Sequence, residues 1–164
     1  MSGGVGERIE STVPLRYIHT LRGHYNRYLT WYRESMVPEN FRIIIEFFNR
    51  VYWIRERCLS HESREPYNQL VKDIEEYIRN EERSYEMEFE LYTYVPASYI
   101  LEFRRQYEGR KRRYYETFEP RFLRLIHDLF LKLMWIETGL LSDEAEEPHA
   151  QLLREMVQLL EREE

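Results

Sequence analysis

The sequence predicts an all-α fold, an antiparallel helical bundle of five or six helices. Apolar residues recur at helical spacing along most of the chain, and only 6 Gly and 6 Pro occur among 164 residues, which leaves little material for turns. The expected connections are short, and short connections favour antiparallel neighbours. We expect a flexible N-terminus at residues 1–11, followed by a single helical domain at 12–164 without an internal repeat.

The first two helices are expected at residues 12–35 and 38–59. The second is the most apolar segment of the chain, and Pro38 suits the first position of a helix because its missing N–H would have no helical partner there. Apolar residues cover most of its circumference, and a helix of this kind is normally buried among others. Residues 38–59 are therefore predicted to form a central buried helix.

A third helix is expected to begin near Pro66, and the sequence leaves its end open. Apolar and acidic residues alternate over residues 85–92, which is typical of a strand, whereas Tyr85, Phe89 and Tyr92 also fit helical spacing. A lone β-strand would lack a partner within the chain. We favour one long helix and keep the lone strand at 85–92 as the alternative.

Three further helices are expected in the second half of the chain. Pro96 and Pro120 precede or open the helices at about 97–118 and 120–138. An acidic linker at 142–147 leads to a C-terminal helix at 148–162, for which a peripheral position is an open alternative.

Several large apolar side chains are predicted to bind a protein partner. On helical wheels the three tryptophans fall on polar or secondary faces, and exposed aromatic residues commonly anchor interfaces. The alternative is that these helices contact two neighbours and bury the rings. The predicted partner-binding residues are Trp31, Trp53, Trp135, Leu152, Met156 and Leu159. They indicate a non-enzymatic protein-interaction module, such as an adaptor, an assembly subunit or a virus-encoded accessory protein. Its partner would be a larger protein or a second copy in a homodimer.

The dense basic segment at residues 103–115 supports an alternative function, nucleic-acid binding. Arginine recognises phosphate and tyrosine stacks on bases. The residues concerned are Arg104, Arg105, Arg110, Lys111, Arg112, Arg113, Tyr107 and Tyr114. Arg110–Arg113 also resembles a nuclear-import signal. The structural alternative is a solvated helix face that the acidic residues 81–90 balance.

Two Arg-x5-His spacings support a more distant alternative. Arg55 with His61, and Arg121 with His127, resemble the Arg-x4–6-His element of HEPN-type helical ribonucleases. The resemblance implies a pair at a helix end that acts on an RNA backbone. Arg55 and His61 fit this better, because Arg121 and His127 would lie on different sides of one helix. The structural alternative is a snorkelling arginine and a loop histidine.

Composition points to an intracellular protein without cofactor or metal. The single Cys58 indicates a reducing compartment, and the N-terminus lacks the pattern of a secretory signal. No apolar run reaches the roughly 18 residues of a membrane span, so no membrane partner is expected. No group of metal ligands and no catalytic motif is recognised, and we therefore predict that the protein is not an enzyme.

Overall fold

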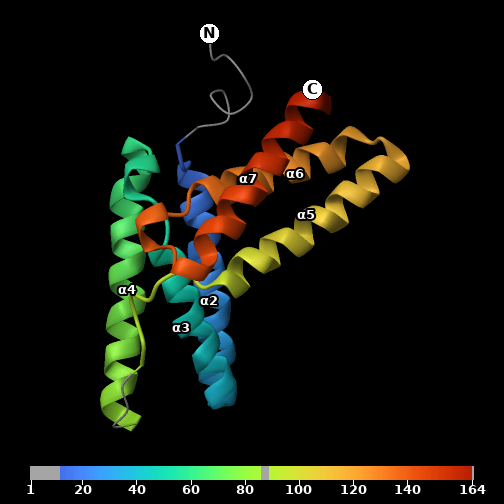
Figure 1. Ribbon diagram of the computed structural model, residues 1–164. Coiled ribbons are helices and arrows are strands. Elements are labelled where there is room, and N and C mark those ends of the chain that lie inside the picture. Colours follow the sequence, from blue (N-terminus) through green and yellow to red (C-terminus); the bar gives the residue numbers. More distant parts are fainter. Residues whose placement is uncertain (1–11, 86–88, 164) are drawn as a thin grey trace. The chain divides into compact units, whose positions relative to one another are not determined.

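The computed structural model describes residues 12–85 and 89–163, and this part of the chain confirms the all-α prediction (Figure 1). It contains six α-helices and two short 3-10 helices, and isolated bridges pair Val13 with Leu59 and Val95 with Leu141. The elements are α2 (Leu15–Ser35), α3 (Pro38–Tyr52), η1 (Glu56–Cys58), α4 (His61–Tyr85), α5 (Ala97–Thr117), α6 (Pro120–Met134), η2 (Thr138–Leu140) and α7 (Asp143–Glu163). The N-terminus at 1–11, predicted to be flexible, lies outside the described residues.

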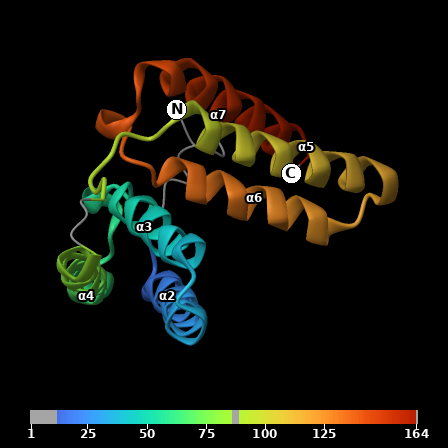
Figure 2. The same cartoon turned by 90° about the horizontal axis from the view of Figure 1, so that it is seen from below.

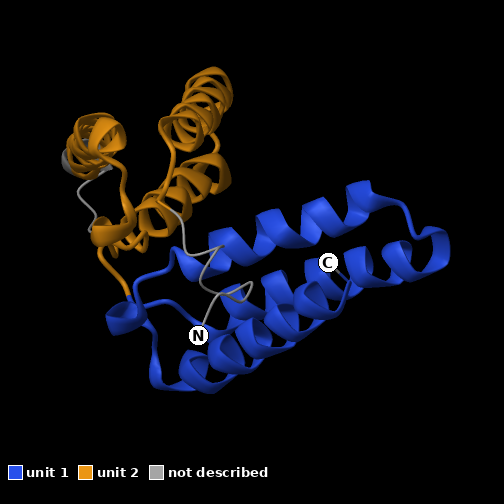
Figure 3. Cartoon of the chain, turned by 90° about the horizontal axis from the view of Figure 1, so that it is seen from above, with its two compact units in different colours: residues 1–11, 94–164 blue, residues 12–93 orange. Residues whose placement is uncertain are grey.

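The chain divides into two compact units (Figure 3). Unit 2 comprises residues 12–93 and holds α2, α3 and α4, whereas the described part of unit 1 comprises residues 94–163 and holds α5, α6 and α7. In each unit the first two helices form a hairpin, and every helix packs against the other two (Figure 2). Each unit therefore has a core of its own. The prediction that residues 12–164 act as one domain stays a prediction.

Unit 1 repeats the elements of unit 2 at an offset of 82 residues, so the expectation of no internal repeat is wrong. The first helices have 21 residues each, the second have 15 each, and a 3-10 helix of three residues follows in both units. The bridges keep the offset, with Val13 paired to Leu59 and Val95 paired to Leu141. Identical residues at this offset include Pro14 and Pro96, Tyr25 and Tyr107, Tyr32 and Tyr114, Pro38 and Pro120, Trp53 and Trp135, and Pro66 and Pro148.

The turn between the first and second helices is the same in both units and contains no glycine. Met36 ends α2 and Phe118 ends α5, each in the left-handed region with φ 55. Each donates its N–H to the carbonyl of the tyrosine four residues earlier, at 2.6 Å. A left-handed backbone costs a residue with a side chain roughly 1 kcal/mol. Both hairpin turns therefore carry the same backbone strain.

A buried side chain near the start of the third helix ties it to the end of the second. In unit 2 the Tyr67 hydroxyl donates to the Val51 carbonyl at 2.9 Å, and burial raises the pKa of Tyr67. In unit 1 the same position is His149, whose Nε2 lies 3.2 Å from the Leu133 carbonyl oxygen. Because a carbonyl only accepts, we assign the ring proton to Nε2. Two different side chains thus bond to the same carbonyl at a helix end, which also accepts a backbone N–H, from Ile54 at 3.2 Å in unit 2 and from Ile136 at 3.3 Å in unit 1.

The central helix is shorter than predicted. It was expected over 38–59, but α3 ends at Tyr52, η1 follows, and Leu59 pairs with Val13 before α4 begins at His61. The chain must leave the helix there to return along the unit, and the apolar residues beyond Tyr52 are buried by the turn instead. The C-terminal helix predicted at 148–162 begins earlier, at Asp143.

The described residues of 85–92 form neither the favoured long helix nor the alternative lone strand. Helix α4 ends at Tyr85, residues 86–88 lie outside the described residues, and residues 89–92 have no regular secondary structure. The Phe89 N–H donates to Glu82 Oε1 at 2.8 Å, and Asn49 Nδ2 donates to the Glu90 carbonyl at 3.1 Å. Side chains of α3 and α4 thus supply the partners that a second strand would have supplied.

Candidate interaction surface

Trp53 and Trp135 are core residues, and the prediction that they are exposed is wrong. Their exposed fractions are 6% and 5%, and each forms the C-cap of the second helix of its unit. A helical wheel placed Trp53 on a polar stripe, but the chain leaves the helix at this residue and the ring turns inward. Its Nε1 donates to the Thr93 carbonyl at 2.7 Å.

The apolar stripe of the C-terminal helix is also in the core of unit 1. Leu152, Met156 and Leu159 are all buried, with exposed fractions of at most 2%. The reason is that α7 packs against both α5 and α6. These residues were predicted to meet a partner, and the structure instead places them against their own unit.

Trp31 is the predicted anchor that lies at the surface, and two unpredicted residues accompany it. Trp31 is 46% exposed, Met36 57% and Val37 39%. Trp31 lies near the end of α2, and Met36 and Val37 follow the helix directly; we call these three residues the apolar tip of unit 2. Nothing in the periodicity of the sequence marks Met36 and Val37, because a turn has no helical face.

Contacts within unit 2 hold the apolar tip in place. The Trp31 ring lies 5.8 Å from the Tyr28 ring, which lies 5.3 Å from the Phe47 ring of α3. The Ser35 hydroxyl accepts from the Val37 N–H at 3.2 Å and from Asn40 Nδ2 at 2.8 Å. The tip is thus presented by ordered neighbours on both helices of the hairpin.

The corresponding turn of unit 1 also exposes a large apolar side chain. Phe118 occupies the position of Met36 and is 63% exposed. Beside it, the hydroxyl of Tyr115 donates to Glu163 Oε2 at 3.0 Å and accepts from Arg162 at 2.9 Å. The two units therefore share one exposed apolar position at the hairpin turn.

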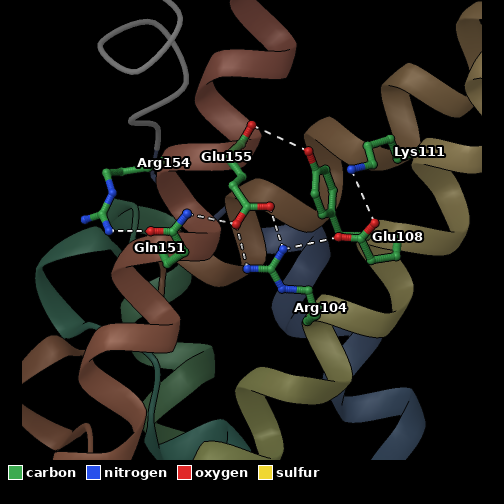
Figure 4. A network of polar contacts seen from close by, with 7 residues as sticks. Arg104, Glu108, Lys111, Gln151, Arg154 and Glu155 are labelled. Atoms are coloured by element: carbon green, nitrogen blue, oxygen red, sulfur yellow. Dashed lines mark hydrogen bonds and ion pairs between the residues drawn. The ribbon is translucent and has the colours of Figure 1, made fainter.

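Arg104, which belongs to the basic segment 103–115, forms hydrogen bonds and ion pairs with other residues of unit 1 (Figure 4). Its guanidinium meets Glu155 through two bonds, Nη1 to Oε1 at 2.6 Å and Nη2 to Oε2 at 2.8 Å, and it meets Glu108 at 3.2 Å. Gln151 donates to Glu155 at 3.0 Å and accepts from Arg154 at 2.6 Å. The hydrogen bonds from Arg104 lower the pKa of Glu155 from 4.5 to about 2.

Unit 2 contains the counterpart of this network at the same positions. Arg22 Nη1 lies 2.9 Å from Asp73 Oδ2, and Gln69 Nε2 donates to Asp73 at 2.7 Å. These residues precede Arg104, Glu155 and Gln151 by the repeat offset. The recurrence indicates that the arginine joins the first helix to the third in both units.

Most of the other residues predicted to bind nucleic acid also have partners within unit 1. Lys111 lies 3.3 Å from Glu108 Oε1 and 5.2 Å from the centre of the Tyr107 ring. Arg110 donates to the Leu125 carbonyl at 2.8 Å.

Of the remaining residues of the segment, one arginine lies over an aromatic ring, two tyrosines are buried and two arginines are exposed. The Arg113 guanidinium lies over the Phe122 ring at 5.4 Å. Tyr107 and Tyr114 are buried, whereas Arg105 and Arg112 are exposed. The two rings that were expected to stack on bases are thus inside the unit.

The two Arg-x5-His spacings fall in different settings. Arg55 and His61 flank η1, and His61 is an exposed first residue of α4. Arg121 pairs with Glu119 at 2.8 Å and lies over the Phe122 ring, whereas His127 is half-buried further along α6. Catalysis by either pair stays a prediction.

The described residues define no metal site and no membrane-spanning helix. No three His, Cys, Asp or Glu side chains among them are grouped so that they could hold a metal ion. Within the same residues, no helix has the length and apolar character needed to cross a bilayer.

Comparison with protein-family models, with curated proteins and with solved structures found no match for this chain.

Proposed function

We propose that this chain is a non-enzymatic protein-interaction module that binds a partner through the apolar tip of unit 2. The exposure of Trp31 near the end of α2, and of Met36 and Val37 directly after it, is the observation that carries the proposal. Single exposed apolar residues are common on proteins, but several large ones within one short segment are typical of an interface. Tryptophan and methionine are also among the residues enriched in interface cores.

Backbone strain at the same turn supports the proposal. Met36 adopts the left-handed conformation that glycine or asparagine would adopt at lower cost. Strain of this kind is found where function requires a particular side chain. Met36 exposes an apolar side chain at this turn, and glycine would expose none.

Light scattering over a dilution series tests the proposal. We expect the wild-type chain to associate, either with itself or with a partner retained on affinity purification. The double variant Trp31→Ser with Met36→Ser should lose that association while it keeps its helical content. The matched control is Tyr94→Ser, which removes an exposed aromatic ring (66% exposed) from unit 1. The proposal would be refuted if the wild-type chain is monomeric at every concentration and if affinity purification retains no partner that the double variant fails to retain.

A further inference from the structure

In unit 2, residues 89–93 cover the groove between α3 and α4. The Phe89 ring lies 4.9 Å from the Phe41 ring, and the Tyr92 ring lies 5.2 Å from Phe48 and 4.7 Å from Tyr52. The Tyr92 hydroxyl donates to Glu75 of α4. The segment thus uses two aromatic anchors three residues apart, and we call residues 89–93 the strap.

Side chains of α3 also bind the backbone of the strap. Asn49 donates to the Glu90 carbonyl at 3.1 Å and accepts from the Thr93 N–H at 3.3 Å, and Trp53 donates to the Thr93 carbonyl. Tyr92 has φ 61 and is 41% exposed, so the strap bends at this residue, and its two rings lie against the aromatic side chains of α3. Unit 2 therefore holds a peptide-like ligand supplied by its own chain.

The corresponding face of unit 1 is a groove between α6 and α7, with a volume of about 380 Å³. Phe130, Met134, Leu153 and Val157 line it, with Arg154 and Gln158. At the repeat offset, Phe130 and Met134 correspond to Phe48 and Tyr52, the two rings that hold Tyr92 in unit 2. The volume is at the lower end of the roughly 300–1,000 Å³ of ligand pockets, which suits one or two side chains.

We propose that the α6–α7 groove of unit 1 binds a segment of a partner protein that carries a Phe or Leu anchor. The inference rests on the proposed function and goes further by naming a second site, in unit 1, and the chemistry of its ligand. The strap of a second copy is not the ligand, because each strap is bound within its own unit 2.

Differences between the two grooves define the preferred ligand. Val157 stands where unit 2 has Glu75, so the groove offers no carboxylate to a tyrosine hydroxyl. Burying an unpaired hydroxyl is unfavourable, and phenylalanine or leucine is therefore preferred over tyrosine. The Arg154 side chain at the rim is 55% exposed and pairs with Glu147 of the same helix at 3.2 Å.

A peptide titration followed by NMR tests this inference on the full chain. The probe is a synthetic peptide of residues 89–94 with phenylalanine in place of Tyr92, which keeps the acidic Glu90. Its backbone is capped at both ends. We expect amide shifts at Met134, Leu153 and Val157, and no shifts with a peptide in which both anchors are alanine. The same peptide with the natural Tyr92 should bind more weakly.

Two variants and a matched control make the test specific. Val157→Glu should weaken binding by roughly tenfold or more, since it introduces a charge into the apolar groove. If that variant is not folded, Gln158→Trp serves instead, because Gln158 is exposed and an indole there would cover the groove. Gln106→Glu adds the same charge at an exposed position of α5 and should bind like the wild type.

The outcomes separate this inference from the proposed function. Peptide binding that is absent, or that is equal in the wild type and both groove variants, would overturn the groove as a peptide site. The loss of association in the Trp31 and Met36 double variant would then still support the interaction module. Failure of both experiments would overturn both proposals.

Discussion

The pair of Arg104 with Glu155 allows a worked prediction for Glu155→Gln. Glutamine keeps the shape of the side chain but removes the charge that two guanidinium bonds at 2.6 and 2.8 Å recognise. A carboxyl pKa that falls from 4.5 to about 2 corresponds to about 3 kcal/mol of stabilisation of the charged form. Both side chains are 29% exposed, and solvent screening reduces this to about 1–2 kcal/mol.

The sign of the pH dependence follows from the direction of the pKa shift. Because the folded-state pKa lies below the unfolded value, the contribution is complete above about pH 4.5. It is lost as the pH falls to about 2, where Glu155 is protonated in the unfolded state and about half protonated in the folded state. Urea unfolding followed by circular dichroism at pH 7 and pH 2 measures the effect. The wild type should be more stable than Glu155→Gln by about 1–2 kcal/mol at pH 7, and the difference should largely disappear at pH 2.

The repeat provides the matched comparison for this prediction. Asp73→Asn removes the counterpart charge in unit 2, where a single contact at 2.9 Å is made with Arg22. Its cost should be smaller, because the bidentate geometry is absent. Equal stability of Glu155→Gln and the wild type at pH 7, or a difference that stays the same at pH 2, would refute the argument that a charge-assisted pair joins α5 to α7.

Two further predictions concern unit 2. Tyr92→Ala should lower the free energy of unfolding by about 1–2 kcal/mol, because two ring contacts and one hydrogen bond are lost. Thermal unfolding measures this, Tyr92→Phe isolates the hydroxyl, and an unchanged melting temperature in Tyr92→Ala would contradict the role of the strap. Tyr67→Phe should cost about 1 kcal/mol, since it removes a buried hydrogen bond to the Val51 carbonyl, which still accepts from the Ile54 N–H at 3.2 Å. Urea unfolding measures this, Tyr67→His should recover part of the loss because His149 occupies the same position in unit 1, and equal stability of Tyr67→Phe and the wild type would contradict the argument.

The sequence predicted the helical class and the start of α3 because those features are local. Pro38 begins α3 as expected, and apolar residues of this helix such as Phe41, Ile44 and Phe48 are buried as expected. The end of α3 was missed because Trp53 and Ile54 continue the apolar pattern while the backbone turns. Their burial depends on the strap and on the fold of the unit, and a helical wheel contains neither.

The repeat could have been found from the sequence, by comparing residues 53–70 with residues 135–152. Trp53, Ile54, Leu59, Ser60 and Pro66 all recur at one offset. The repeat was missed for two reasons. An offset of 82 residues is much longer than the helical periods that were compared, and most positions between the identical residues differ. The exposed Met36 and Val37 could not be predicted in this way, since exposure at a turn depends on which residues the neighbouring helices cover.

The pattern of divergence between the units separates positions that build the frame from positions that are free to specialise. Identical or equivalent residues hold the hairpin turn, the end of the second helix and the arginine pair between the first and third helices. Among the many positions that differ, two lie where unit 2 receives its strap: unit 1 has Leu131 in place of Asn49 and Val157 in place of Glu75. Both lack the polar group that the strap uses in unit 2. A face without a ligand would be expected to carry charge, because an exposed apolar groove lowers solubility. Phe130 is identical to Phe48, and Met134 and Val157 are apolar, which favours a groove that binds an apolar ligand of a different sequence.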